Sequence, residues 1–162
     1  MEDITGPIAI GCDHAAYALK EAIKKFLLQK GIEIVDVGTN GEDSVDYPDF
    51  GEKVATMVSL KKVPRGILIC GTGIGMSMVA NRFPGVRAAL CSGMYSAAMS
   101  RRHNDANILA LGSRVIGEGL ALEIVRVWLD TPFEGGRHQI RVNKIEQATS
   151  QKAEGPNPGT SR

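Results

Sequence analysis

The sequence has few cysteines and few aromatic residues, and its charges nearly cancel. Its 162 residues include three cysteines, 5% aromatic residues, 19 Lys and Arg, and 18 Asp and Glu. Three cysteines without a C-x-x-C pair predict neither a disulfide framework nor a zinc site. A balanced charge gives no reason to expect nucleic acid or a membrane surface as a partner. The sequence therefore points away from disulfide scaffolds, metal cages and charge-driven binding proteins.

Long hydrophobic runs are also missing. No apolar stretch approaches the roughly 20 residues that a transmembrane helix needs, and the N-terminal residues MEDIT are acidic where a secretory signal would be basic. We therefore expect a cytoplasmic protein. The length suits one domain over residues 1–149, followed by a tail over 150–162 that is polar, rich in Pro and Gly, and expected to be disordered.

Short apolar runs alternate with helical patterns along the chain. The apolar runs predict strands at 8–12, 32–37, 66–70, 86–91 and 107–111. Helical patterns lie between these strands, and two further helices are predicted at 117–130 and 137–148, joined by a linker at 131–136. Strands that are apolar throughout are typical of a parallel sheet covered by helices on both faces. The predicted fold class is therefore α/β, with a doubly wound parallel sheet.

A cysteine and a glycine-rich loop follow the third predicted strand. Cys70 ends the strand, and the loop Gly71-Thr72-Gly73-Ile74-Gly75 comes next. Ligands of open parallel sheets bind where the strands end. Successive N–H groups and a helix start can hold a phosphate or an enediolate oxygen and favour the thiolate form of a cysteine. The loop lacks the full dinucleotide spacing and the P-loop lysine. On the glycines alone, a tight structural turn is an equally good interpretation.

Other ionisable residues follow the remaining predicted strands. Asp13 and His14 come after the first strand, and His103 and Asn104 end the helix between the fourth and fifth. Cys12 and Cys91 are expected to be small buried side chains, as free cysteines usually are. His138 is expected to be an ordinary helix histidine. His103 and His14 are candidates because of their location.

Arginines form a possible phosphate site. Arg137 and Arg141 are four residues apart and would project from one face of a helix, and Arg114 follows the fifth strand. Guanidinium groups match phosphate oxygens in shape and charge. The alternative for the two helical arginines is a solvated basic face.

Several long segments stand in order and without gaps between about residues 7 and 148. They are GCDHAAYALK, the D-Y-P at 46–48, ILICGTGIGMSMVANR, YSAAMSRRHNDANILALGSRVIG and EGGRHQIRVNKI. Together these segments resemble the type B ribose-5-phosphate isomerases of the ribose/galactose isomerase family.

This resemblance implies a Rossmann-like α/β/α domain with five strands, in a homodimer with two shared active sites that sometimes pairs into a tetramer. Family members use either a cysteine or a nearby glutamate as the base, and Met76 stands here at the glutamate position. The resemblance thus implies Cys70 as the base, Thr72 beside it, and His103 assisting ring opening. The implied sugar-phosphate ligands are Asp13, His14, Gly71, Thr72, Gly73, Ile74, Gly75, Asn104, Arg114, Arg137 and Arg141.

The implied reaction interconverts ribose 5-phosphate and ribulose 5-phosphate through a cis-enediolate, as in the pentose phosphate pathway. No electron leaves the substrate, so no nicotinamide, flavin or metal is expected. Two alternatives stay open from the sequence. One is an isomerase of six-carbon sugar phosphates, such as allose or galactose 6-phosphate, and the other is a non-catalytic nucleotide-binding module that uses the glycine loop.

Overall fold

The backbone forms one sheet between two layers of helices. The computed structural model describes residues 6–153, and the side chains of residues 6–148. Five strands pair in parallel in the order β2-β1-β3-β5-β4, and this confirms the predicted α/β class. The strands are β1 (Ile8–Cys12), β2 (Ile34–Asp36), β3 (Arg65–Cys70), β4 (Ala88–Leu90) and β5 (Ile108–Gly112).

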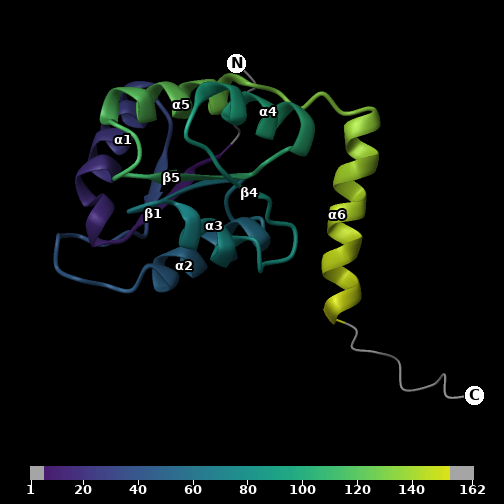
Figure 1. Ribbon diagram of the computed structural model, residues 1–162, viewed down its shortest axis with the longest axis horizontal. Helices are drawn as coiled ribbons and strands as arrows, with labels where there is room; N and C mark the ends of the chain where they lie inside the picture. The colour runs from purple at the N-terminus through teal and green to yellow at the C-terminus, as the bar shows by residue number, and fades with distance from the viewer. Residues whose placement is uncertain (1–5, 154–162) are drawn as a thin grey trace, which may run out of the picture.

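Helices cover both faces of this sheet, as Figure 1 shows. The upper layer in that view holds α1, α4 and α5, the lower layer holds α2 and α3, and α6 stands beside the sheet. Within residues 6–153, no helix is long and apolar enough to cross a membrane. The helices are α1 (Tyr17–Gln29), α2 (Tyr47–Ser59), α3 (Ile74–Ala80), α4 (Met94–Asn104), α5 (Glu118–Asp130) and α6 (Arg137–Ala153), with a short 3-10 turn at His14–Ala16 before α1.

Alternating side chains of the central strands build two hydrophobic cores. On β3, Ile67 and Ile69 pack into the core beneath α1 and α5, whereas Leu68 and Cys70 pack into the core beneath α2 and α3. Both faces of the central strands β1, β3 and β5 are therefore buried. This double burial explains why the strands are apolar at every position rather than at alternate ones.

The structure moves some of the predicted boundaries. Only three residues of the run at 86–91 form β4, because the backbone N–H of Arg87 is bonded to the Asn107 side chain instead of to a strand. Strand β5 begins one residue later than predicted. Helix α6 continues past the predicted end at 148 to Ala153, so 150–153 are helical rather than part of a disordered tail. Residues 154–162 of that tail lie outside the described residues.

Parallel pairing fixes where each helix ends. We call the side where the strands end the carboxyl edge of the sheet, and the side where they begin the amino edge. Helix α4 starts after β4 at the carboxyl edge and must return to the amino edge before β5 begins. Its 11 residues span about 16 Å at the rise of an α-helix. Residues at the end of α4 therefore lie far from residues that follow the strands.

A buried ion pair joins α1 to β2. The Lys20 side chain is 1% exposed, and its Nζ lies 2.7 Å from Oδ2 of Asp36. Lys24 approaches the same carboxylate at 2.6 Å. Burial disfavours the charged form of Asp36, but hydrogen bonds from the two lysines outweigh burial and lower its pKa. The pair thus holds α1 against the edge strand β2.

We predict that Asp36→Asn lowers the free energy of unfolding by about 3 kcal/mol at neutral pH, because Lys20 stays buried without its main counter-charge. Since the folded pKa of Asp36 is lowered, its contribution is complete above the unfolded pKa of about 4 and is lost as the pH falls through the folded pKa. Urea unfolding of both proteins between neutral and acidic pH measures this. The difference between them should shrink as the pH falls.

Asp130→Asn is the matched control. Asp130 lies at the exposed end of α5, 3.6 Å from Arg126, and its loss should cost less than about 0.5 kcal/mol. Equal losses in the two variants would contradict the importance of the buried pair.

Candidate active site

Cys70 lies at the carboxyl edge with a hydrogen-bond donor already aimed at its sulfur. The backbone N–H of Gly73 donates to Sγ of Cys70 at 3.1 Å, and the side chain is 5% exposed. The backbone donor places a positive partial charge beside the sulfur. Met76 is fully buried in the same core, so an apolar residue fills the position at which some family members would use glutamate. The local arrangement suits a cysteine that loses and regains a proton.

The loop after Cys70 depends on a glycine at position 73. Gly73 has a φ of +77°, and a Cβ there would lie 2.6 Å from Leu90 Cδ1 and 2.8 Å from the Leu111 carbonyl carbon. A side chain would therefore both strain the backbone and collide with β4 and β5. The Thr72 hydroxyl accepts the N–H of Ile74 at 3.3 Å. The loop is a tight structural turn, and the same turn brings the Gly73 N–H to Cys70.

Residues after β5 lock this loop to its neighbours. The N–H of Ser113 donates to the Cys70 carbonyl and that of Arg114 to the Gly71 carbonyl, both at 2.9 Å. The Ser113 hydroxyl also donates to the Ala15 carbonyl at 2.8 Å, so it joins the ends of β5 and β1. Arg114 is exposed and lies over Gly71, where a Cβ would be 3.5 Å from its Nη1. One cation thus sits beside the cysteine loop.

The end of β1 contributes two more of the predicted site residues to the carboxyl edge. The Asp13 carboxylate accepts the N–H of Ala15 at 3.1 Å, and Nδ1 of His14 accepts the N–H of Val45 at 3.2 Å. The carboxyl edge therefore brings Asp13 and His14 to the same side of the sheet as Cys70.

Sequence reasoning gave no role to two residues at this edge. The Tyr47 ring presses against Gly75, where a Cβ would lie only 2.6 Å from the ring. The D-Y-P segment was a signal for Tyr47, although it carried no stated role. Ser113 had no signal beyond its place after the fifth strand, because its link to Ala15 joins residues 98 apart in the chain.

The other two cysteines differ from Cys70. Burial raises the pKa of Cys12 to about 11 and also raises the pKa of Cys91. Both side chains are packed in the core beneath α1 and α5. They stay protonated and apolar at neutral pH, as expected from the sequence.

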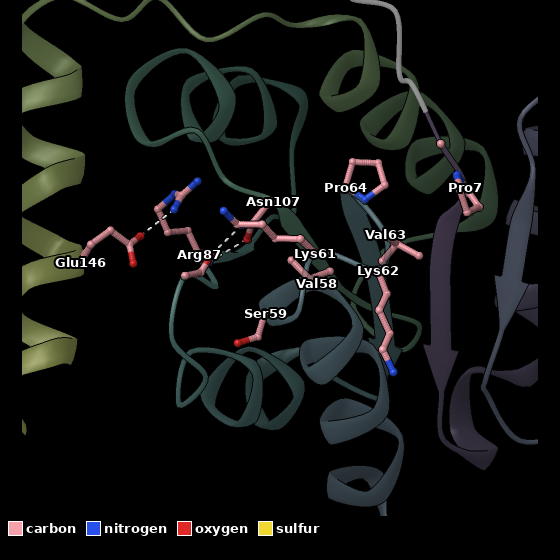
Figure 2. A pocket seen from close by; sticks show the side chains of 12 residues that line it. Pro7, Val58, Ser59, Lys61, Lys62, Val63, Pro64, Arg87, Asn107 and Glu146 are labelled. Carbon is pink, nitrogen blue, oxygen red and sulfur yellow. Dashed lines mark hydrogen bonds and ion pairs between the residues drawn. The ribbon is translucent and has the colours of Figure 1, made fainter. Parts of the chain in front are cut away.

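The remaining predicted site residues lie at the amino edge. His103 and Asn104 end α4, and the Asn104 carbonyl accepts Nε of Arg87, the residue before β4, at 3.0 Å. Figure 2 shows Arg87 reaching across to Glu146 on α6, at 2.6 Å. This ion pair fixes α6, whose first turns carry the exposed Arg137 and Arg141.

The predicted residues therefore fall into two groups within one chain. The carboxyl-edge group is Asp13, His14, Cys70, Gly71, Thr72, Gly73, Ile74, Gly75 and Arg114. The amino-edge group is His103, Asn104, Arg137 and Arg141. The length of α4 separates the two groups within one chain, whereas the resemblance implies sites shared between two chains.

Two histidines at the amino edge form a stacked pair. The rings of His103 and His138 lie 4.3 Å apart and 6° from parallel. Ligand atoms of these histidines and of Glu134 all fall within 4.8 Å of one another. A ring nitrogen binds a metal in the plane of its ring, and parallel stacked planes do not converge on one ion. The three residues are thus arranged as a stack with a neighbouring carboxylate, and His138 is more than an ordinary helix histidine.

Cavities open at both edges. One of about 210 Å³ adjoins the cysteine loop and is lined by Thr72 and Gly112, with exposed Ile74, Leu90 and Val115 around it. Another of about 640 Å³ lies at the amino edge, between Pro7, Lys61 and Arg87 (Figure 2). The amino-edge cavity contains none of the predicted catalytic residues, so the smaller cavity is the better candidate for substrate.

The chain is similar to several known isomerases. The ribose-5-phosphate isomerase B of Escherichia coli is 51% identical over 138 residues, covering 85% of this chain and 93% of the relative. A D-erythrulose-4-phosphate isomerase of Pectobacterium atrosepticum is 49% identical over 140 residues, covering 85% and 91%. The solved structure of Clostridium thermocellum ribose-5-phosphate isomerase B superimposes with a TM-score of 0.89 at 55% identity, covering 90% of this chain and 99% of that one.

The family assignment also covers all of the predicted site residues. A family model described as Ribose/Galactose Isomerase matches residues 8–145, which include both edge groups. The resemblance seen in the sequence is confirmed, and the chain belongs to the ribose/galactose isomerase family.

Proposed function

We propose that this protein interconverts ribose 5-phosphate and ribulose 5-phosphate in the pentose phosphate pathway. The observation that carries the proposal is the Gly73 N–H, which donates to Sγ of Cys70 at the carboxyl edge of the sheet. Family membership supports the same reaction class. A nucleotide-binding module would not need a thiol at this position.

Cys70 acts as the base in the proposed reaction. Its thiolate takes the proton from C2 of the open aldose and returns a proton to C1, while the hydroxyl proton passes from O2 to O1. The intermediate is a cis-enediolate, whose negative oxygen is met by N–H groups of the 71–75 loop and by the nearby Arg114. C1 is reduced and C2 is oxidised within the same molecule, so the reaction needs no redox cofactor.

His103 opens the furanose ring before that step. An imidazole can deliver a proton to the ring oxygen and take one from the anomeric hydroxyl near neutral pH. Arg137 and Arg141 bind the phosphate and hold the far end of the sugar in place, while Asp13, His14 and Asn104 bind its hydroxyl groups. Ring opening and phosphate binding are thus assigned to the amino-edge group.

We propose that two chains combine their edges to form each site. Cys70 and His103 lie at opposite edges of one sheet, so a substrate a few ångströms long requires His103 of a second copy. Exposed apolar residues surround the cavity beside the cysteine loop: Ile74, Leu90 and Val115, with Met94 and the 78% exposed Tyr95 beginning the next helix. Exposed apolar patches of this kind mark interaction surfaces. A symmetric dimer would bury this surface and complete two sites.

The direct test mixes the purified protein with ribose 5-phosphate and measures ketose formation. Allose 6-phosphate, galactose 6-phosphate and erythrose 4-phosphate complete the substrate panel, since a relative at 49% identity is named a D-erythrulose-4-phosphate isomerase. We expect the highest kcat/KM with ribose 5-phosphate. A higher kcat/KM with another sugar phosphate would assign that sugar phosphate as the substrate. No isomerisation of any sugar phosphate in the panel would refute the proposal.

Cys70→Ala should lower kcat by about a thousandfold or more and leave substrate affinity within about threefold, because the thiol performs chemistry and contributes little recognition. Cys12→Ala is the matched control and should keep kcat within about threefold, since Cys12 is fully buried in the core beneath α1 and α5 and does not line the cavity beside the cysteine loop. Steady-state kinetics and calorimetric binding measure both. A Cys70→Ala enzyme whose kcat lies within about tenfold of the wild-type value would show that Cys70 is not the base.

Arg137→Ala and Arg141→Ala should each weaken ribose 5-phosphate binding by about tenfold or more, as expected for a lost charged hydrogen bond. Arg126→Ala on α5 is the control, because Arg126 is equally a surface arginine but pairs with Glu123 and Asp130. Residual activity on unphosphorylated ribose should not change. Equal losses on the two sugars would assign the arginines a structural role.

The shared site predicts that two inactive proteins complement each other. Cys70→Ala and His103→Ala homodimers should both be inactive, whereas a mixed dimer holds one site with both defects and one with neither. Random exchange makes half of all dimers mixed, so activity should recover to about a quarter of wild-type sites. Co-expression or refolding permits exchange, and mass spectrometry counts mixed dimers. No recovery when mixed dimers are present would place both residues of one site in a single chain.

A further inference from the structure

The stacked histidine pair has one member that the proposed chemistry does not use. His103 is half-buried at the end of α4, and His138 is 5% exposed in the first turn of α6. Their rings are 4.3 Å apart and nearly parallel. A nearly buried imidazole in full contact with the proposed ring-opening group needs an explanation.

We propose that His138 is a positioning residue that holds the His103 ring in the plane needed for ring opening. The inference rests on the proposed role of His103 and extends it. A histidine side chain rotates about two bonds, so the α4 backbone does not by itself fix the imidazole plane. Packing against a second flat ring does fix it, because tilting His103 would drive it into His138.

His138 is itself held firmly. Its backbone N–H donates to the Gly135 carbonyl at 3.0 Å, and the ring Nε2 lies 3.6 Å from a carboxylate oxygen of Glu134. Farther along α6, the ion pair between Arg87 and Glu146 fixes the helix against the start of β4. The stack is therefore anchored on α6 as well as on α4.

The surroundings of His138 favour its neutral form. Burial lowers the pKa of His138, and the charges of His103, Arg137 and Arg141 lower it further, while Glu134 opposes them. The ring that packs against His103 is therefore a flat, uncharged surface.

This arrangement also couples two functions to one helix. His138 lies between Arg137 and Arg141, so the placement of α6 sets both the phosphate-binding arginines and the plane of His103. A sugar phosphate bound by the arginines would then meet an imidazole already oriented toward its ring oxygen. A misplacement of about 1 Å at such a group can cost about a hundredfold in rate.

The test isolates ring opening from isomerisation. In a Cys70→Ala background, isomerisation is blocked, but opening and closing of the ring still interconverts the two anomers of ribose 5-phosphate. Exchange NMR measures this rate at increasing protein concentration. Three changes are added to that background: His138→Leu, which removes the flat ring; His138→Phe, which keeps it; and Gln139→Leu, an exposed neighbour on α6, as the control.

We expect His138→Leu to lower the catalysed anomer exchange by about tenfold or more, with His138→Phe and Gln139→Leu within about threefold of the background. Affinity for ribose 5-phosphate, measured by calorimetry, should change less than threefold in all of them. The His103 Cε1–H resonance should lose its ring-current shift in His138→Leu and keep one in His138→Phe.

Three outcomes would overturn the inference. Unchanged exchange in His138→Leu, or equal loss in His138→Phe, would show that a flat neighbour is not what His103 needs. Parallel loss of exchange and affinity would make His138 a structural support for α6. Failure of the proposed function gives a different result: His103→Ala in the same background would leave anomer exchange unchanged, and the role of His138 would fall with that of His103.

Discussion

A helix between two parallel strands must carry the chain back across the sheet, and this constraint organises the whole site. Helix α4 begins near the carboxyl edge and ends at the amino edge, so it delivers His103 away from Cys70. The carboxyl edge holds the thiol, its N–H donor and Arg114, and the amino edge holds an imidazole and the arginines of α6. In the proposed mechanism each edge supplies half of the isomerase site, and two copies of the chain combine them.

Much of the fold could be predicted because it depends on local patterns. Apolar runs predicted the strands, and the central strands are buried on both faces. Cys70 was identified from its place between a strand and a glycine loop, and the structure adds the Gly73 N–H at its sulfur. Cys12 and Cys91 were correctly expected to be buried, because free cysteines usually behave as small apolar side chains.

Features that depend on distant contacts could not be predicted. The residues alone did not show that His103 and Cys70 lie at opposite edges of the sheet, because the edge that a helix end reaches is set only when the sheet is assembled. The stack of His138 on His103 needs α6 to dock against α4, and the contact of Tyr47 with Gly75 joins two different helices. The end of α6 was also misplaced, since polar residues at 150–153 resemble a tail although they continue the helix.

The claim that two chains build each site is tested most directly by a crystal structure of the Cys70→Ala protein with ribose 5-phosphate bound. The account predicts that C1 and C2 of the sugar lie beside residue 70 of one chain, and that its phosphate contacts Arg137 and Arg141 of another chain, with His103 of that second chain at the ring oxygen. A sugar bound by residue 70, His103 and both arginines of the same chain would contradict it.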